Sequence, residues 1–359
     1  MKVLHVVGTR PNFMKVAPLM RALTAIDGVE QRLVHTGQHY DQVLSDAFFE
    51  DLEMPYPDHF LGVGSGTHGE QTARVIAGLE PILIDEPPDA IVVPGDVNST
   101  MAAAVTAVKL GIPIVHLESG LRSRDRGMPE EHNRIIADHL GDLLLTPSRD
   151  GYRNLLAEGI PAERIAFVGN TMIDSLRTHE ARARQLDVAR RDLGVEDYVL
   201  VTLHRPAVVD DEAELLRVME TLERIAAERP LLFPVHPRTA ANLERAGWAA
   251  GSVRLLEPQG YLRFLSLQAS AFAVLTDSGG VQEETTALGV PCFTLRANTE
   301  RPITIDEGTN RLLGVGPGAL ADFRDALASL DGARPSVPEG WDGHAAERAA
   351  AVIVERLGG

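Results

Sequence analysis

Short apolar runs alternate with amphipathic segments along the first half of the chain. Short apolar runs suit buried strands, whereas apolar residues three and four positions apart form one face of a helix. This alternation indicates βα units and a mostly parallel sheet. The strand-like runs are KVLHVV, QRLVHT, AIVVP, IPIVHL and DLLLT, and the helical segments lie at 13–26, 40–51, 98–110, 129–140 and 148–158.

A second series of the same kind follows. The runs YVLVTL, LLFPV, VRLL and FAVLT precede helical patterns near 211–228, 238–247 and 260–270 and after Gly280. We therefore predict an α/β fold made of two Rossmann-like domains, residues 1–170 and 171–341. A last helix at about 342–359 is expected to cross back onto the first domain.

Composition is that of a soluble protein with two domains of ordinary size. The 359 residues are 44% hydrophobic and 24% charged, and no apolar run approaches the roughly 18 residues of a membrane span. The start, MKVLHVVGTRPN, lacks a signal-peptide cleavage site. Cys292 is the only cysteine, which fits a reducing compartment. We therefore expect a cytoplasmic protein without membrane association.

A formal charge of −17 argues against a nucleic-acid partner, which calls for a basic face. An anionic small ligand would have to be held by local cations and amide dipoles. Two places offer them. Gly8 ends the first strand and Arg10 and Lys15 follow it, and the turn at 276–280 joins a strand to a helix start. A glycine turn at a helix N-terminus favours phosphate.

Carboxylates follow two consecutive strands of the first domain. Asp96 comes after AIVVP and Glu118 after IPIVHL. Paired parallel strands lie about 4.8 Å apart, so the two could share one site and supply an acid and a base. Glu131 lies in a first helical turn, where acids commonly complement the dipole, and Glu130 is spaced to pair with Arg134. By position alone, Glu131 is interpreted as structural.

The second domain offers donors at its strand ends. His204 and Arg205 follow YVLVTL, and His236 follows LLFPV. A histidine beside an anion site is expected to contact the ligand. Glu284 falls on the inward side of the helix after the glycine turn. It fits either a ligand of ribose hydroxyls or the partner of an arginine, and its position does not separate the two.

Several motifs lack the context that would give them a function. Gly64, Gly66 and Gly69 match G-x-G-x-x-G, but no clear strand precedes them, so a nicotinamide cofactor is not expected. There is no P-loop lysine and no zinc-binding histidine spacing. Neither a metal nor a cofactor is therefore predicted.

Taken together and in order, nine motifs closely resemble the non-hydrolysing UDP-N-acetylglucosamine 2-epimerases. This resemblance covers nearly the whole chain and implies two domains facing across a cleft, the GT-B arrangement. The motifs are GTRPNFMK, HTGQHYDQ, GDVNST, HLESGLRS, MPEEHNR, VGNTMIDSL, VTLHRP, VHPRT and TDSGGVQEETTALGVPCFTLRANTERP.

The resemblance implies interconversion of UDP-GlcNAc and UDP-N-acetylmannosamine without metal or nicotinamide. Anti elimination of UDP would give 2-acetamidoglucal, and UDP would then add back. Asp96, Glu118 and Glu131 match the family's acid/base carboxylates, and His204 matches the histidine at the diphosphate and leaving oxygen. The matched binding residues are Arg10 and Lys15 for substrate, Gln259 and Phe264 for uracil, Ser278, Gly279 and Gly280 for diphosphate, Glu284 for ribose and Arg301 for phosphate.

Some residues depart from the family pattern. Members activated by their own substrate often read Gln-His-Arg-Gln where this chain has Gln38, His39, Tyr40 and Asp41. Four residues are assigned only to an allosteric site or to supporting contacts: Gln38, His39, Arg205 and His236. We expect a homodimer that binds a UDP-sugar. The alternatives are a GT-B glycosyltransferase, a hydrolysing epimerase, an epimerase of UDP-diacetamido uronic acids and a UDP-sugar sensor.

Overall fold

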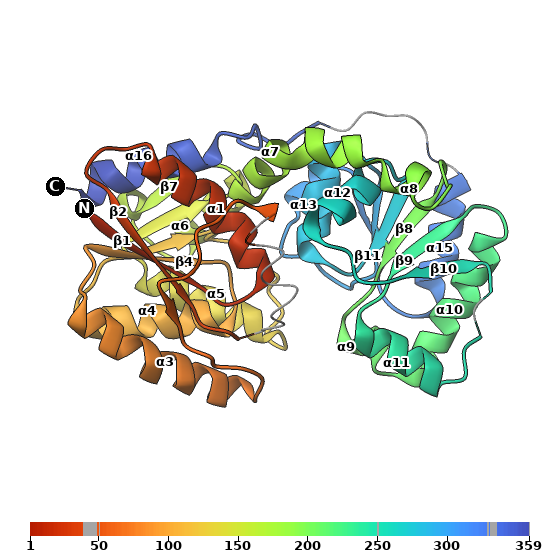
Figure 1. The fold of residues 1–359 in the computed structure, drawn as a ribbon, viewed down its shortest axis with the longest axis horizontal. Helices are drawn as coiled ribbons and strands as arrows, with labels where there is room; N and C mark the ends of the chain where they lie inside the picture. Colours follow the sequence, from red (N-terminus) through yellow and green to blue (C-terminus); the bar gives the residue numbers. More distant parts are fainter. Residues whose placement is uncertain (39–48, 50, 250, 329, 331–335, 359) are drawn as a thin grey trace. The chain divides into compact units, whose positions relative to one another are not determined.

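The computed structural model describes residues 1–38, 49, 51–249, 251–328, 330 and 336–358. The chain divides into two compact units: Met1–Thr178 with Glu339–Gly359, and His179–Pro338 (Figure 1). The division falls inside helix α7 (Thr171–Leu186) and not at residue 170. The last helix, α16 (Ala345–Leu357), packs on α1 (Arg10–Thr24) and belongs to the first unit.

The first unit is built on a parallel sheet with the strand order β3-β2-β1-β4-β5-β6-β7 among the described residues. Its strands are β1 (Lys2–Val7), β2 (Glu30–His35), β3 (His59–Phe60), β4 (Ala90–Pro94), β5 (Ile114–Leu117), β6 (Leu143–Thr146) and β7 (Ile165–Phe167). Besides α1, α7, α16 and the 3-10 turn Ala162–Arg164, its helices are α3 (His68–Asp85), α4 (Asn98–Leu110), α5 (Pro129–Leu140) and α6 (Arg149–Ala157).

Helices cover the sheet of this unit on both faces. Figure 1 shows α1 beside α16 on one face and α3 and α4 side by side on the other. Alternate apolar residues of β1, β2 and β4 are buried against α3, α4 and α5, and the apolar residues between them are buried as well. Such nearly continuous apolar strands are expected when both faces of a parallel sheet are covered.

The second unit repeats this plan with the strand order β10-β9-β8-β11-β12-β13, also parallel. Its strands are β8 (Val199–Thr202), β9 (Leu231–Pro234), β10 (Val253–Leu256), β11 (Ala273–Thr276), β12 (Cys292–Thr294) and β13 (Asn310–Leu312). Its helices are α8 (Val188–Arg191), α9 (Pro206–Val209), α10 (Glu212–Ala226), α11 (Pro237–Arg245), α12 (Tyr261–Ala269), α13 (Gly279–Leu288), α14 (Ile303–Asp306) and α15 (Pro317–Ala328).

Each sheet has one point at which the strand order reverses. The reversal lies between β1 and β4 in the first unit and between β8 and β11 in the second. In open α/β sheets, ligands bind outside the carboxyl ends of the strands at such a point. The predicted α/β fold class with two parallel sheets is confirmed, and most of the candidate residues follow these strands.

Helix α3 is the largest element that the sequence did not predict. It contains Pro81 and two glycines, which obscure a helical pattern, and its buried face is only Gln71, Val75, Leu79 and Leu83. That single row at a spacing of four is narrower than the usual apolar stripe. The helix predicted at 40–51 lies mainly outside the described residues.

The segment before α16 docks on the end of β7 through two glycines. Gly169 has φ +91°, and a Cβ on it would lie 2.0 Å from the Gly340 carbonyl oxygen. Gly169→Ala should therefore lower the free energy of unfolding by about 2–3 kcal/mol, through backbone strain and overpacking. Urea unfolding measures this. Gly28→Ala is the control, because Gly28 has φ +80° and open space around it; equal losses in both variants would contradict the docking argument.

Candidate active site

The predicted site residues fall into one group in each unit. Arg10, Lys15, Gln38, Asp96, Glu118 and Glu131 belong to the first unit. His204, Arg205, His236, Gln259, Phe264, Ser278, Gly279, Gly280, Glu284 and Arg301 belong to the second. His39 lies outside the described residues.

Glu118 and Lys15 form a buried ion pair at the carboxyl ends of the first unit's central strands. The two side chains are 6% exposed each. β4 and β5 are paired neighbours, the condition for Asp96 and Glu118 to share a site. Gly95 leaves room for the ion pair, because a Cβ there would lie 3.0 Å from Lys15 Nζ and 3.2 Å from Glu118 Oε2. Glu118 has φ +70°, a left-handed conformation that non-glycine residues adopt at a cost and mostly at functional sites.

Arg134 joins the other two carboxylates. From α5 its buried guanidinium pairs with Glu131 and with Asp96. The sequence predicted a pair between Arg134 and Glu130. Arg134 pairs instead with Glu131, three residues before it, and with Asp96, which follows β4. Because Arg134 contacts carboxylates on two different elements, it fixes the orientation of both. Residue spacing along helix α5 could not reveal this double contact.

Glu131 accepts hydrogen bonds from the Ser123 amide (2.9 Å), the Ser123 hydroxyl (2.9 Å) and the Arg124 amide (2.8 Å). Burial alone would raise the pKa of Glu131, but these amides and the Arg134 charge outweigh it and hold the pKa below its usual value. Glu131 is thus an ionised carboxylate with fixed orientation, an arrangement suited to orient a hydrogen-bond donor.

Asn12 is a residue of this site that sequence reasoning missed. Its side-chain oxygen accepts from the Gly8 amide (3.0 Å) and the Thr9 amide (3.1 Å), and its nitrogen donates to the Pro94 carbonyl (3.2 Å). It thereby ties the loop after β1 to the end of β4, next to Asp96. An asparagine in the first turn of the helix after a glycine turn was the available signal.

A buried charged network lies beneath these loops. His116 contacts the Gly95 carbonyl through Nε2 (2.8 Å) and Asp138 through Nδ1 (2.6 Å). Asp138 accepts from the Gly120 amide (3.2 Å) and pairs with Arg122 (2.6 Å). Burial would raise the pKa of Asp138, but His116 and Arg122 lower it below its usual value. The network fixes the loops that carry Asp96 and Glu118.

Gln38 is buried and bonded to the start of α4. Its side-chain oxygen accepts from the Ser99 amide (3.0 Å) and hydroxyl (2.8 Å), and its carbonyl accepts from Gln71 (3.3 Å). These contacts place Gln38 beside the loop that carries Asp96. They are those of a residue that supports this loop.

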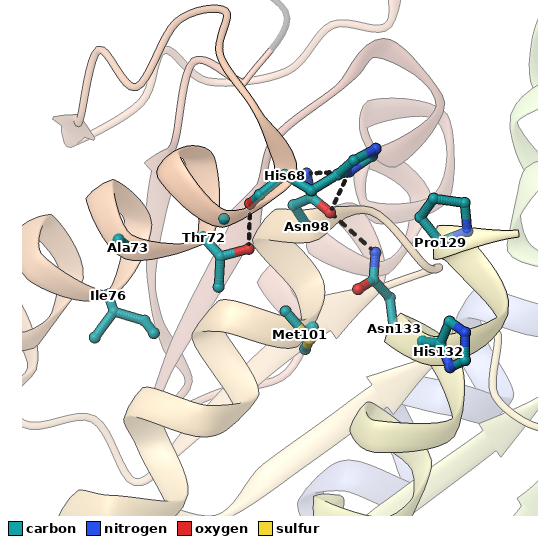
Figure 2. Close-up of a pocket in the computed structure, with 10 residues that line it drawn as sticks. His68, Thr72, Ala73, Ile76, Asn98, Met101, Pro129, His132 and Asn133 are labelled. Atoms are coloured by element: carbon teal, nitrogen blue, oxygen red, sulfur yellow. Dashed lines mark hydrogen bonds between the residues drawn. The ribbon is translucent and has the colours of Figure 1, made fainter.

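An open groove of about 480 Å³ lies where α3, α4 and α5 begin. Figure 2 shows Asn98 between His68 and Asn133, with hydrogen bonds to both. Asn133 also donates to the Asp96 carbonyl (2.9 Å). None of the predicted site residues in the described ranges lines the groove, so the predicted chemistry lies beside it and not in it.

In the second unit, His204 and Arg205 follow β8 and Asp277 follows β11. Asp277 is fully buried, and one carboxylate oxygen accepts from the amides of His204 (2.9 Å) and Arg205 (2.8 Å). The other oxygen lies 2.7 Å from His204 Nδ1. Sequence reasoning named Asp277 only as part of a turn; an acid at a strand end before two glycines was the signal for its role.

The glycine turn starts helix α13, and Arg301 lies directly on it. A Cβ on Gly279 would lie 2.5 Å from Arg301 Nη1, so glycine is required there for space. Arg301 pairs with Glu283 (2.7 Å) and with Glu300. A helix N-terminus next to a guanidinium has the composition of an anion site.

Glu284 is buried, and its Oε1 has no hydrogen-bond partner among the described residues. Burial raises the pKa of Glu284 to about 8, Gln268 opposes the rise, and the charge of Glu283 adds to it. The alternative interpretation of Glu284 was an ion pair with an arginine. Arg301, the arginine beside this helix, pairs with Glu283 instead. A buried carboxyl with an unsatisfied oxygen favours a polar ligand, as a ribose would be.

The pH dependence of stability should reveal Glu284. Its folded-state pKa of about 8 lies above the ordinary 4.5, so between these values the folded state holds a proton that the unfolded state has released. Stability therefore falls as pH rises through this window. Glu284→Gln removes the penalty, and its stability relative to wild type should rise with pH by at most about 1.4 kcal/mol per unit. Urea unfolding at several pH values measures this; a constant difference, as expected for the exposed Glu307→Gln, would contradict it.

The remaining predicted residues lie on the loops and helices after β9 and β10. His236 caps α11 and accepts from the Arg238 amide (3.3 Å). Gln259 donates to the Glu257 carbonyl (2.7 Å) and accepts from Arg263 (3.0 Å). Phe264 is half-buried against the apolar core behind β8 and β11. These contacts do not by themselves assign a ligand to the three residues.

The first unit gathers carboxylates that can move protons, and the second gathers amides, a histidine and arginines that can hold an anion. Among the described residues, no cluster of three or more histidine, cysteine or acidic side chains is arranged to hold a metal ion. No helix in the described ranges is long and apolar enough to cross a membrane. Fold and residues together define an α/β protein with two Rossmann-like units.

Comparison with known proteins gives the family. A family model described as UDP-N-acetylglucosamine 2-epimerase matches residues 21–354. The UDP-N-acetylglucosamine 2-epimerase of Methanocaldococcus jannaschii is 41% identical over 331 residues, 88% of each chain. The UDP-2,3-diacetamido-2,3-dideoxy-D-glucuronate 2-epimerase of Pseudomonas aeruginosa is 40% identical over 318 residues, also 88% of each.

A solved structure agrees. The crystal structure of the M. jannaschii UDP-GlcNAc 2-epimerase in complex with UDP-GlcNAc and UDP matches 99% of this chain and 100% of that chain, with a TM-score of 0.92 at 39% identity. The chain belongs to the UDP-N-acetylglucosamine 2-epimerase family, a family of isomerases. This assignment supports the epimerase over the glycosyltransferase.

Proposed function

We propose that this protein interconverts UDP-GlcNAc and UDP-N-acetylmannosamine by epimerisation at C2. Family membership over residues 21–354 carries the proposal. The contacts in the first unit support it, because three carboxylates there are each held by a buried cation. A protein that only binds an anionic diphosphate gains little from acids beside its sugar.

In this proposal the two units bind different parts of the substrate. The turn at 278–280 and Arg301 hold the diphosphate, Glu284 binds the ribose, and Gln259 and Phe264 bind the uracil. Support for this comes from the helix N-terminus at Gly279 and from the buried Glu284, whose Oε1 has no hydrogen-bond partner within the described part of the chain. Arg10 and Lys15 contact the substrate from the first unit.

The carboxylates Asp96, Glu118 and Glu131 perform the proton transfers. One of them removes the C2 proton while the C1–O bond breaks and its electron pair leaves with UDP, giving 2-acetamidoglucal. A proton then returns to C2 on the opposite face, and UDP adds back to C1. His204 stabilises the leaving diphosphate oxygen. These steps need a base on one face of the sugar at C2 and an acid on the opposite face, which is general acid–base catalysis.

A direct test is to incubate the purified protein with UDP-GlcNAc alone and follow the anomeric protons by NMR. The proposal predicts an equilibrium mixture with the manno epimer and no free sugar. Release of N-acetylmannosamine and UDP would indicate a hydrolysing enzyme, and turnover only after addition of an acceptor would indicate a glycosyltransferase. Unchanged UDP-GlcNAc would contradict the proposal.

The identity of the sugar requires a second experiment. The Pseudomonas aeruginosa relative is 40% identical to this chain and is named for a diacetamido uronic acid. UDP-2,3-diacetamido-2,3-dideoxy-D-glucuronate is therefore compared with UDP-GlcNAc under the same conditions. We expect kcat/KM to be higher for UDP-GlcNAc. A reversed order would keep the reaction type and change the substrate.

We further propose that the protein works in the cytoplasm as a homodimer. The absence of a cysteine pair in the sequence supports a reducing compartment. Sedimentation velocity at several protein concentrations tests the dimer, and a single monomeric species throughout would contradict it.

A further inference from the structure

Asp277 lies at the reversal of the second unit's sheet, where β8 and β11 are neighbours. The registers Thr276↔Thr202 and Leu275↔Val201 bring the ends of the two strands together. Asp277 continues β11, and its carboxylate reaches the turn after β8. It is fully buried, so whatever it contacts is held without competition from water.

The carboxylate uses both oxygens on the neighbouring turn. One accepts from the amides of His204 and Arg205, and the other lies 2.7 Å from His204 Nδ1. The Arg205 side chain closes the turn by donating from Nε to the Asp277 carbonyl (3.1 Å). One acidic residue thus fixes the backbone of the turn and one side of the imidazole.

The contact with Asp277 favours one placement of the hydrogens on His204. Burial would raise the pKa of Asp277, but the His204 side chain and the two amides outweigh it and keep the carboxyl ionised. An ionised carboxylate only accepts hydrogen bonds, so its oxygen 2.7 Å from Nδ1 favours a hydrogen on that nitrogen. Nε2 is then the nitrogen left for a ligand, and the His204 side chain is 54% exposed.

We propose that Asp277 is a positioning residue that acts on the reaction through His204. It holds the imidazole with Nδ1–H toward itself. When both ring nitrogens carry hydrogens, Nε2–H is thereby directed at the UDP oxygen that receives the electron pair when the C1–O bond breaks. The same carboxylate–imidazole logic orients the histidine of hydrolase triads. The inference deepens the proposed function and rests on its assignment of His204 to the leaving group.

If Asp277 only anchored the turn, an uncharged hydrogen-bond acceptor could replace it. The two backbone amides need only an acceptor, which an asparagine oxygen also provides. The imidazole needs a negative charge, which asparagine lacks, and the NH2 group of the introduced side chain would face Nδ1 and force the hydrogen onto Nε2 in a neutral ring. Asp277→Asn therefore keeps the anchor and removes the orienting charge.

The first readout does not depend on activity. In long-range ¹H–¹⁵N spectra of the full-length protein, wild-type His204 should show a protonated Nδ1, and Asp277→Asn should show the hydrogen on Nε2 alone. His204→Ala identifies the signals. An unchanged protonation pattern in the variant would overturn the inference, whether or not the protein is an epimerase.

The second readout is kinetic. Asp277→Asn should lower kcat by about 10²-fold and change KM by no more than about threefold, because the lost interaction belongs to the transition state. The variant Asp210→Asn, which loses an exposed pair with Arg238, should keep wild-type kcat.

In a His204→Ala background, Asp277→Asn should cause no further loss of kcat, since Asp277 acts through that side chain. A further loss of about 10²-fold there would overturn the inference in favour of a structural role. If wild-type protein leaves every UDP-sugar unchanged, the proposed function fails, and the NMR readout still tests the orientation of His204.

Discussion

Replacing Asp96 by asparagine should lower kcat by about 10²- to 10⁴-fold, the range that general acid–base catalysis supplies. Glu131→Gln should have an effect in the same range. In the structure both carboxylates are bound to Arg134, and each amide replacement keeps the size of the side chain while removing its ability to take a proton. Initial rates of epimerisation with purified variants measure this effect.

UDP affinity separates loss of chemistry from loss of binding. The residues proposed to hold UDP belong to the second unit, so titration calorimetry with UDP should give nearly wild-type affinity for both variants. Glu130→Gln is the matched control, since Glu130 neighbours Glu131 in the first turn of α5 and takes no part in the contacts with Arg134 described above. Wild-type turnover in Asp96→Asn and Glu131→Gln would remove both residues from the mechanism.

Asp138→Asn should destabilise the protein by about 3–5 kcal/mol, because it removes one partner from a buried charged network. Asp138 has no exposed surface and contacts His116, Arg122 and the Gly120 amide. Asparagine leaves the charge of Arg122 with Glu158 alone and cannot accept from all three donors. Urea unfolding at pH 7 measures the loss.

The matched control is an ion pair on the surface of the same unit. Arg149 and Glu339 contact each other at 2.6 Å with both side chains more than half exposed, and exposed pairs contribute little to stability. Glu339→Gln should therefore leave the unfolding midpoint unchanged. An equally small shift for Asp138→Asn would show that the network does not hold the loops.

The sign of the Asp138 effect with pH follows from its lowered pKa. A carboxyl whose folded-state pKa lies below its unfolded value stabilises the protein at neutral pH, and this stabilisation is lost as pH falls through the folded-state pKa. The difference between wild type and Asp138→Asn should accordingly shrink on acidification.

The alternation of strands and helices predicted the fold because both sheets are parallel and buried, so each strand appears as an apolar run. It also located Asp96, Glu118, His204 and the glycine turn, since parallel strands deliver the residues after their carboxyl ends to one edge. Glu131 needed the family resemblance, because an acid in a first helical turn has a common structural explanation.

Contacts between elements could not be predicted in the same way. The pairing of Arg134 with Asp96 crosses 38 positions of the sequence, and that of Lys15 with Glu118 crosses 103. Lys15 is predicted to contact substrate, and the sequence did not reveal that it also pairs with Glu118. Which partner a charged side chain takes depends on strand order and burial, and neither leaves a periodic signal in the sequence.

Exchange of the C2 proton is the most direct test of the proposed elimination and re-addition of UDP. The protein is incubated with UDP-GlcNAc in D2O, and both epimers are examined by NMR. The proposed elimination and re-addition predict deuterium at C2 of the UDP-N-acetylmannosamine formed, and loss of this exchange in Asp96→Asn and Glu131→Gln. Formation of the manno epimer with its C2 proton retained, or no conversion at all, would contradict this mechanism.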